Sequence, residues 1–394
     1  MDADPVFEML GRSLRLAVIG GAPGSFIGAT HRTAARLDGR YELVAAALSS
    51  DPERSRAEGP ALGIAADRAY GSGAELLDGE AGRNDGADVV AIMTPNDSHH
   101  GYATGALDRG FDVICDKPIT NTLDEALDVV AKVRRSGLVF CLTHNYTGYP
   151  MVRQAKAMVD DGQLGEVRLV QVEYVQGGKA AENDPDPAGR LPWRYDPVRG
   201  GPSLVMGDIG SHAHNLARFV TGLEVAEVSA EVGTIVPHRL VHDYAAAMLR
   251  FDNGARGTLW VTQAAAGMEN SLRIRVSGTR GSLEWEQEHP TALVLRPLTG
   301  PAQTRTPNGP GTLPLSARAA RLAAGHPEGF VAAFANLYSD AAEAIAARRS
   351  GVAPDPLALH FPTAEDGARG VKFVVAAIAS SAAGARWTDA SLEL

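Results

Sequence analysis

Two residues capable of acid–base chemistry lie four positions apart in the stretch GDIGSHAHN, residues 207–215. Asp208 supplies a carboxylate and His212 an imidazole, and a helix would place both on one face. The pair suits a catalytic acid and base, a metal site, or the polar start of an ordinary helix. His214 would point away from His212 on a helix, so we expect no metal site here.

A glycine-rich stretch, VIGGAPGSFIG, follows an apolar run and leads into a helical pattern. Its glycines are Gly20, Gly21, Gly24 and Gly28. Glycines after a strand allow a tight turn and let backbone N–H groups approach a pyrophosphate at a helix N-terminus. A strict G-x-G-x-x-G beginning at Gly20 would need glycine in place of Ala22, so the loop is longer than the strict motif. The context predicts dinucleotide binding.

The end of the next apolar run bears on which dinucleotide binds. An Asp or Glu there bonds the ribose 2′-hydroxyl of NAD. Ser49 and Ser50 occupy the place, with Asp51 just beyond and Arg54 nearby. The serines and Arg54 would suit a 2′-phosphate, whereas Asp51 would suit either the ribose or a helix cap. NAD and NADP both stay open.

The elements that must position these residues alternate in the first third of the chain. Short apolar runs predict strands over residues 14–21, 41–50, 87–95, 111–118 and 138–146, with helical patterns between them. Alternating strands and helices imply βαβ units and a doubly wound parallel sheet, which is a Rossmann domain. We place this domain at residues 1–146.

The pattern changes after about residue 150 and predicts a second, α+β domain over residues 147–394. Residues 167–176 alternate as a strand, and hairpins are expected around Asp252-Asn253-Gly254 and over residues 278–281. Segments 177–202 and 298–316 are rich in loop-forming residues. The chain ends in helical patterns, and whether these pack back on the first domain stays open.

Composition excludes several classes of protein. The chain has 394 residues and a net charge of −10, with no basic block typical of nucleic-acid binding. It contains no apolar run of about 20 residues that would cross a membrane, and its start lacks the features of a signal peptide. Cys115 and Cys141 lie in apolar runs, which predicts two reduced core thiols. A cytoplasmic enzyme fits these observations.

Three motifs in order carry a resemblance to a known family. They are TPNDSHH (94–100), CDKP (115–118) and GDIGSHAHN. The chain resembles the Gfo/Idh/MocA oxidoreductases, named for glucose–fructose oxidoreductase, inositol dehydrogenase and a rhizopine-catabolism protein, which carry T-P-N-x-x-H, E-K-P and D-x-G-x-H. Asp116 replaces the usual Glu and keeps its charge, and the glycine loop is longer than usual. The resemblance implies a Rossmann domain followed by a domain with an open, mainly antiparallel sheet that forms a homodimer or homotetramer.

The resemblance also implies NAD(P)-dependent oxidation of a secondary hydroxyl of a sugar, glycoside or inositol-like polyol, or the reverse reduction. The hydroxyl proton must leave as the hydride departs, and a histidine titrates close to working pH, so His212 suits the base. Lys117 would stabilise the developing alkoxide from the end of its strand. Asp208 would orient the imidazole or bond a substrate hydroxyl.

Other motif residues complete the implied site. The expected cofactor-binding residues, besides Gly20, Gly21 and Gly24, are Ser25, Phe26, Ile27, Ser49, Ser50, Arg54, Thr94, Pro95, Asn96, His99, Asp116, Lys117 and Asn145. The expected substrate-binding residues are Lys117, Tyr146, Trp193, Arg194, Asp208 and His212. His242 and Asp243 are weaker candidates, and His100, which has no motif support, is expected on the surface.

Two alternatives to a simple dehydrogenase follow from the same resemblance. In one, a tightly bound NAD oxidises a sugar transiently to its 3-keto form, which leads to glycoside cleavage or to hydride exchange between sugars. In the other, the chain is a dinucleotide-binding sensor without catalysis, which the presence of Lys117, Asp208 and His212 disfavours. The particular substrate, its reacting carbon and the direction of the reaction stay open.

Overall fold

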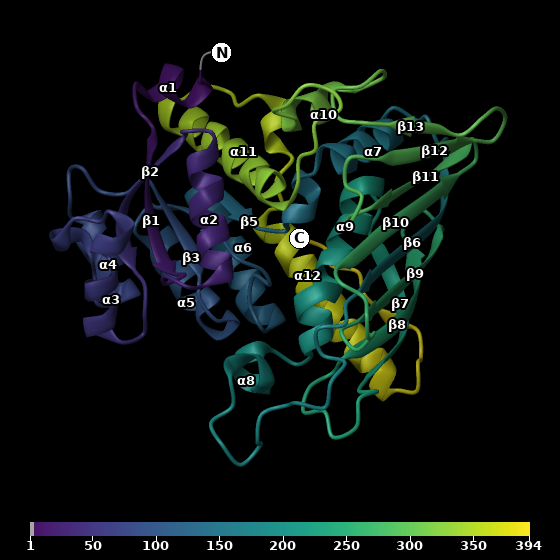
Figure 1. Ribbon diagram of the computed structural model, residues 1–394, viewed down its shortest axis with the longest axis horizontal. Coiled ribbons are helices and arrows are strands. Elements are labelled where there is room, and N and C mark those ends of the chain that lie inside the picture. The colour runs from purple at the N-terminus through teal and green to yellow at the C-terminus, as the bar shows by residue number, and fades with distance from the viewer. Residues whose placement is uncertain (1–3) are drawn as a thin grey trace. The chain divides into compact units, whose positions relative to one another are not determined.

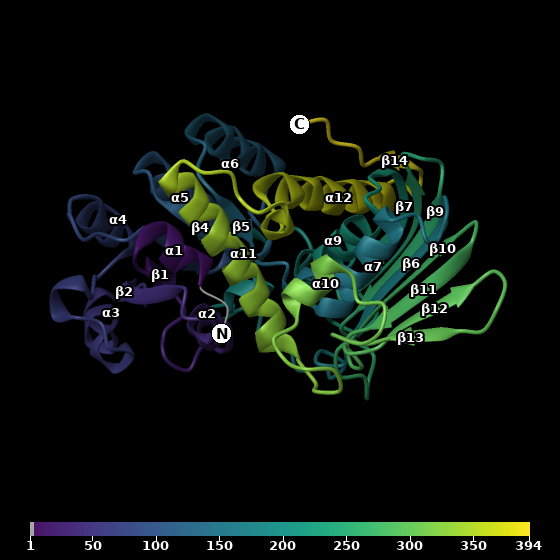
Figure 2. The same ribbon diagram turned by 90° about the horizontal axis from the view of Figure 1, so that it is seen from above.

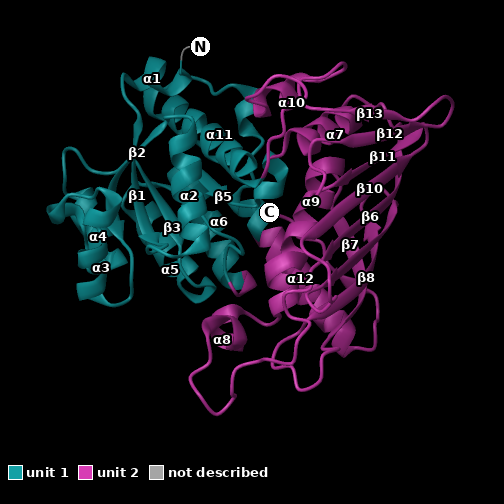
Figure 3. Cartoon of the chain, viewed as in Figure 1, with its two compact units in different colours: residues 1–120, 124–148, 330–367 teal, residues 121–123, 149–329, 368–394 magenta. Residues whose placement is uncertain are grey.

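The computed structural model describes residues 4–394, which fall into two compact units (Figures 1 and 3). The first unit comprises the chain up to residue 120 together with residues 124–148 and 330–367. The second comprises residues 121–123, 149–329 and 368–394. The sequence left open whether its last helices return to the first domain, and residues 330–367 do belong to the first unit.

The first unit is built on five parallel strands in the order β2-β1-β3-β4-β5. They are β1 (Leu14–Gly20), β2 (Tyr41–Ala47), β3 (Val89–Met93), β4 (Asp112–Cys115) and β5 (Phe140–Leu142). β1 and β3 are apolar and buried over most of their length, as strands covered on both faces must be. The doubly wound parallel sheet expected from the alternating pattern is confirmed.

Helices cover both faces of this sheet (Figure 2). They are α1 (Pro5–Leu10), α2 (Phe26–Leu37), α3 (Pro52–Glu58), α4 (Gly73–Ala81), α5 (His99–Asp108), α6 (Leu123–Ser136) and α11 (Phe330–Ser350). α2 and α11 pack together on one face, where Phe334 and Tyr338 of α11 join Val18 of β1 in one apolar core. α5 packs on β3 and β4 from the other face.

The second unit contains a nine-stranded sheet in the order β13-β12-β11-β10-β6-β9-β8-β7-β14. Its strands are β6 (Val167–Val175), β7 (Val225–Gly233), β8 (Tyr244–Phe251), β9 (Arg256–Thr262), β10 (Ser271–Gly278), β11 (Gly281–Glu286), β12 (Leu293–Pro297), β13 (Gln303–Arg305) and β14 (Thr388–Asp389). Neighbouring strands are antiparallel except β6 and β9. Both predicted hairpins, β8–β9 and β10–β11, are present, which confirms the mainly antiparallel sheet.

The helices of the second unit lie on one side of its sheet (Figures 1 and 2). They are α7 (Pro150–Asp160), α9 (Ser211–Thr221), α10 (Pro314–Ala319) and α12 (Ala364–Ala382), whose first turn belongs to the first unit, whereas the short α8 (Pro197–Gly200) lies in the long loop between β6 and β7. α9 contacts β6, β9 and β10, and α7 contacts β11 and β12. On the opposite face Leu169, Met248 and Trp260 are exposed, so that face is the open one.

Both cysteines are buried free thiols in the first sheet. Cys115 ends β4, and Cys141 lies in the neighbouring β5 opposite Ile114. Burial raises the pKa of the Cys115 thiol well above its ordinary value. Because the thiolate is the reactive form, Cys115 is a core residue and not a nucleophile.

Neither a membrane-spanning helix nor a metal-ligand cluster occurs within residues 4–394. No helix in this range is long and apolar enough to cross a membrane. No three histidine, cysteine or acidic side chains of these residues are placed to hold a metal ion together.

Candidate active site

The glycine loop joins β1 to α2 with little room for side chains. Gly20 and Gly21 have φ values of 87° and 68°, where residues with a Cβ are strained. A Cβ on Gly20 would lie 2.7 Å from the carbonyl oxygen of Met93, and one on Gly28 would lie 2.4 Å from that of Gly21. The tight turn and the close helix–strand contact therefore both depend on glycine.

Gly24 differs from the other glycines of this loop. It is exposed, has a φ of 88°, and a Cβ added to it would meet no atom within 4 Å. The hydroxyl of Ser25, the next residue, accepts from the N–H of Gly28 and caps α2. The loop thus leaves open space in front of a capped helix N-terminus, which suits a pyrophosphate.

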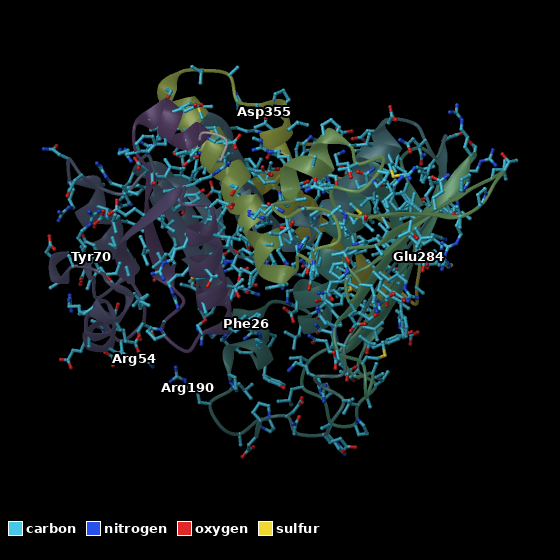
Figure 4. The ribbon with its side chains drawn as sticks, turned by 45° about the horizontal axis from the view of Figure 1, so that its top comes forward. Phe26, Arg54, Tyr70, Arg190, Glu284 and Asp355 are labelled. Atoms are coloured by element: carbon cyan, nitrogen blue, oxygen red, sulfur yellow. The ribbon has the colours of Figure 1, made fainter. Side chains whose placement is uncertain are left out.

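The first turn of α2 completes this loop. Phe26 is 74% exposed and its ring centroid lies 6.0 Å from that of Phe330 on α11 (Figure 4). Ile27 is half-buried. Arg32, one turn further along, donates from its guanidinium to the carbonyl of Gly21 and fixes the loop from behind.

The segment after β2 is polar, and Ser50 and Asp51 are exposed. Arg54, labelled in Figure 4, is exposed as well. The Asp51 carboxylate accepts from the N–H groups of Glu53 and Arg54, so it caps α3. The Arg54 guanidinium is bonded to Glu58 at 2.8 Å. The two groups that would decide between a 2′-hydroxyl and a 2′-phosphate are therefore both engaged in local contacts of α3.

The loop after β3 carries the TPNDSHH motif and is tied to the loop after β4. The ring of His99 is fully buried, with Nδ1 at 2.8 Å from the carbonyl oxygen of Pro118 and Nε2 at 2.9 Å from that of Thr94. The Ser98 hydroxyl bonds Thr94, and the side chain of Asn96 is buried. His99 therefore joins two loops of the sheet edge.

Lys117 lies between two residues, Asp116 and Pro118, whose contacts join this loop to its neighbours. The Asp116 carboxylate accepts from the N–H of Lys117 at 3.0 Å and from the hydroxyl of Thr143, beyond β5, at 2.9 Å. The carbonyl of Pro118, on the other side of Lys117, contacts His99. The half-buried Lys117 is thus held from both sides at the carboxyl end of β4, where parallel sheets bind ligands.

The turn after β5 supplies a buried polar group. Asn145 begins the 3-10 turn Asn145–Gly148 and is buried, yet its Nδ2 has no hydrogen-bond partner among residues 4–394. A buried donor without a partner is costly, so it points to a missing acceptor such as a bound ligand. Tyr146 is also buried, and its ring lies edge-on to Phe330.

In the second unit, Asp208 and His212 lie at an irregularity. Residues Met206–Gly210 form a π-helical turn that continues directly into α9 at Ser211. The wider turn is a feature that the Asp-to-His spacing did not predict, and such turns recur at functional sites. His212 is buried with its ring 6.4 Å from that of Tyr174, and the Asp208 carboxylate is half-buried.

The carboxylate of Asp208 is bonded to residues that the sequence did not single out. Gln263 donates from Nε2 to Asp208 Oδ2 at 3.0 Å and to Gln176 Oε1 at 3.2 Å. Gln176 in turn donates to Asn270 at 2.6 Å. Amides lack a motif, and the only signal available was that each lies in or next to a predicted strand.

The long loop before α8 holds the aromatic candidates. Trp193 is half-buried, and the exposed Arg194 stacks its guanidinium on the indole at 4.3 Å. Lys179 donates to the hydroxyl of Tyr195 at 2.8 Å. These contacts order a loop that composition alone presented as irregular.

The remaining histidine candidates have other partners. His214 is buried and stacked on Phe373 of α12, with ring centroids 4.4 Å apart. His100 was expected simply on the surface, but it is half-buried and bonded to Asp128 at 2.9 Å. Burial lowers the pKa of the half-buried His242.

Asp243, the acidic neighbour of His242, is fully buried and accepts from the N–H groups of Ile235 and Val236. It thereby fixes the loop between β7 and β8. Its hydrogen bonds make it a structural carboxylate of that loop.

Comparisons with known proteins agree on one family. Residues 14–144 match the family described as "Oxidoreductase family, NAD-binding Rossmann fold", and residues 152–284 match "GFO/IDH/MocA C-terminal domain". The uncharacterized oxidoreductase YfiI of Bacillus subtilis is 31% identical over 385 residues, 97% of this chain and 98% of the relative. The chain belongs to the Gfo/Idh/MocA oxidoreductases. Its first unit is accordingly an NAD-binding Rossmann domain.

Solved structures support this membership. An oxidoreductase from Sinorhizobium meliloti is 44% identical with a TM-score of 0.86, covering 95% of this chain and 99% of the other. An inositol dehydrogenase homolog from Azotobacter vinelandii, complexed with NADH and myo-inositol, is 33% identical with a TM-score of 0.88, covering 97% and 98%. This family member is therefore an oxidoreductase of a class that acts on sugar and polyol hydroxyls.

Proposed function

We propose that this family member oxidises a secondary hydroxyl of a cyclic polyol, sugar or glycoside to a ketone with NAD⁺, or catalyses the reverse reduction. The likeness to an inositol dehydrogenase homolog over nearly the whole chain carries the proposal. The hydrogen bonds that position two of the reactive residues also support it. Lys117 is held at the end of β4, and Asp208 belongs to a network of side-chain amides.

In this proposal, different residues transfer the proton, stabilise the negative charge and orient the substrate. His212 takes the hydroxyl proton during oxidation and returns it during reduction. Lys117 stabilises the negative charge that develops on the substrate oxygen. Asp208 orients the substrate by accepting from a neighbouring hydroxyl. When bound, NAD supplies the acceptor for the hydride.

We assign the cofactor to the edge of the first sheet. The glycine loop and the N-terminus of α2, with Phe26 and Ile27, hold the pyrophosphate. Thr94, Pro95 and Asn96 border the cofactor, His99 and Asp116 act through the loops they fix, and the unpartnered Nδ2 of Asn145 bonds the nicotinamide or the substrate.

We propose that the enzyme prefers NAD to NADP because Ser49 and Ser50 lie where the ribose 2′-position of the cofactor binds. The Arg54 guanidinium, which would be needed for a 2′-phosphate, is held by Glu58. A serine hydroxyl can bond a ribose hydroxyl but supplies no compensating charge for a phosphate. We expect a higher kcat/KM with NAD⁺ than with NADP⁺.

Three further residues complete the substrate side of the proposal. Tyr146, Trp193 and Arg194 are proposed to border the substrate. The stacking orients the exposed Arg194, whose guanidinium supplies a charged donor for sugar hydroxyls.

A substrate panel tests the function. The protein is incubated with NAD⁺ or NADP⁺ and a series of inositols, hexoses and glycosides, while the absorbance of reduced cofactor is followed. We expect oxidation of at least one compound, and a fall in kcat of about a hundredfold or more for His212→Asn. His289→Asn, which changes an exposed histidine, is the matched control and should leave kcat unchanged.

Other outcomes of the panel would contradict the proposal. Copurified NAD with turnover in the absence of added cofactor would instead support transient oxidation leading to glycoside cleavage or sugar–sugar exchange. Dinucleotide binding without oxidation of any compound would support a sensor.

We also propose that the open sheet face joins copies of the chain into a homodimer or homotetramer. A shallow groove of about 160 Å³ on this face is lined by Gln171, Val172, Glu173, Thr258, Trp260, Arg273 and Arg275. Exposed apolar groups beside charges of both signs suit a two-fold contact, where each patch meets its own copy.

Sedimentation velocity tests this assembly. We expect the wild type to sediment as a dimer or tetramer and Trp260→Asp to shift toward the monomer. Val352→Asp, at an exposed position of the first unit, is the control and should sediment as the wild type. A monomeric wild type would refute the assembly without touching the proposed reaction.

We further propose a cytoplasmic location. The two free thiols, Cys115 and Cys141, support it, because free thiols persist in reducing compartments.

A further inference from the structure

Gln263 lies at a distinctive place in the second sheet. It follows β9 directly, and Gln176 follows β6 directly. β6 and β9 are the one parallel pair of that sheet within residues 4–394, with Val175 opposite Thr262. The two glutamines therefore extend the pair in matched positions at its carboxyl ends.

The backbone of Gln263 is fixed on both sides. Its N–H donates to the carbonyl of Asp243 at 3.0 Å, and its carbonyl accepts from the N–H of Lys179 at 2.8 Å. The residue as a whole is 5% exposed. Its carboxamide therefore has little freedom to choose a different set of partners.

The orientation of that carboxamide is determined by its neighbours. Both partners of Nε2, Asp208 Oδ2 and Gln176 Oε1, are acceptors. The Gln176 amide is oriented in turn because its Nε2 donates to Asn270 Oδ1, which also accepts from the Tyr174 hydroxyl. Turning the Gln263 amide over would set its oxygen against a carboxylate and another carbonyl oxygen, which is unfavourable.

This orientation leaves Gln263 Oε1 as a buried acceptor. The atom accepts no hydrogen bond from residues 4–394. A buried carbonyl oxygen without a donor is unfavourable, and a bound donor removes that penalty. A hydroxyl group of a polyol is such a donor.

We propose that Gln263 is a specificity-determining residue of the reaction: its Nε2 fixes the Asp208 carboxylate, and its Oε1 accepts from a substrate hydroxyl other than the one that is oxidised. The assignment rests on the proposed function. It predicts that the chain distinguishes a polyol from the analogue that lacks this one hydroxyl, because the unpartnered oxygen stays unsatisfied with the analogue.

The test pairs protein variants with deoxy substrates. kcat/KM is measured for myo-inositol and for its monodeoxy analogues with the wild type, Gln263→Met and Gln263→Glu. For one analogue we expect the wild type to prefer myo-inositol by about tenfold, and Gln263→Met to lower that preference to about one. If Gln263 were purely structural, its replacement would lower kcat/KM for both substrates by the same factor and leave the preference unchanged.

Gln263→Glu separates the two contacts. The glutamate keeps an acceptor toward the substrate but sets an oxygen against Asp208, so kcat/KM should fall for both substrates while the tenfold preference remains. Gln163→Met, at an exposed position, is the matched control and should equal the wild type. Circular dichroism and thermal unfolding verify that each variant is folded.

The outcomes also separate this assignment from the proposed function. A wild type that oxidises no polyol or sugar overturns both. An active wild type whose preference for myo-inositol over every monodeoxy analogue is unchanged in Gln263→Met overturns the assignment alone.

Discussion

The two units hold their reactive side chains by different means. In the first unit, Lys117 is placed by contacts to the main chain, from Asp116 to its own N–H and from His99 to the carbonyl of Pro118. In the second unit, Asp208 is placed by a chain of side-chain amides that begins at Gln263. In the first arrangement side chains bond backbone groups, and in the second side chains bond one another.

This difference bears on how such an enzyme could change its substrate. The side chains of Asp116 and His99 hold Lys117 through the backbone, so replacing either one shifts the lysine that every substrate meets. An amide network offers a new set of donors and acceptors with each replacement, and buried polar groups discriminate strongly when they are left unpaired. We therefore expect substitutions in the first unit to affect all substrates alike and those in the second to affect them selectively.

The largest expected effect is that of replacing Lys117, the residue that the contacts of the first unit hold in place. Lys117→Ala removes the cation proposed to stabilise the developing alkoxide, so we expect kcat to fall about a thousandfold with every substrate. NAD⁺ affinity, measured by quenching of protein fluorescence, should change by less than about threefold, because the amine acts on the substrate oxygen. Lys132→Ala, on α6, removes a lysine bonded to Asp108 and is the control. An undiminished kcat would refute the role of Lys117.

Some of this arrangement could be predicted from sequence. The glycine loop and the turn after β4 are local, since a strand, a turn and a helix follow one another within a few residues. Lys117, Asp208 and His212 carried recognisable motifs. The π-helical turn at Asp208 left no pattern in residue types, because its extra residue does not disturb the apolar spacing enough to be seen.

The rest depends on pairing between distant segments. Gln176 and Gln263 are 87 residues apart and meet only because β6 pairs with β9 in parallel. Hairpins predict which consecutive strands are neighbours, but they say nothing about this central pair. The attachment of His99 to Pro118 likewise requires the order of β3 and β4 in the sheet, so His99 was predicted only to border the cofactor.

We also expect a buried histidine in the core of the first unit to make its free energy of unfolding depend on pH. His31 on α2 is fully buried, bonded to the Tyr338 hydroxyl at 2.7 Å, and burial lowers its pKa from 6.5 to about 4. Between these values the unfolded chain binds more protons than the folded chain, so the free energy of unfolding falls as the pH drops from 6.5 toward 4. The loss reaches about 3 kcal/mol at full protonation.

Hydrogen exchange of first-unit peptides at pH 7, 6 and 5 measures this loss. His31→Asn keeps a polar partner for Tyr338 but does not titrate, so its unfolding free energy should fall less over the same range. The difference between the two profiles isolates His31 from the carboxylates that both proteins share. Parallel profiles for wild type and variant would contradict the prediction. Second-unit peptides should show no such difference, which would separate the acid responses of the two units.

The smallest expected effect tests whether main-chain contacts position Lys117. Both ring nitrogens of His99 lie near carbonyl oxygens, and the tautomer decides which nitrogen donates, so two side-chain amides can test the contacts one at a time. His99→Asn places its amide near the former Nδ1 and retains the bond to Pro118. His99→Gln places it near the former Nε2 and retains the bond to Thr94.

If the contact to Pro118 positions Lys117, the two variants should differ in kcat. We expect a fall of about tenfold for His99→Gln, the equivalent of one lost hydrogen bond, and of about threefold for His99→Asn. A residue needed only for packing would lower kcat and thermal stability together, and equally in both variants. Because the contact lies in the main chain beside Lys117, the ratio between the variants should be the same for every substrate, whereas ratios between Gln263 variants should change with the substrate.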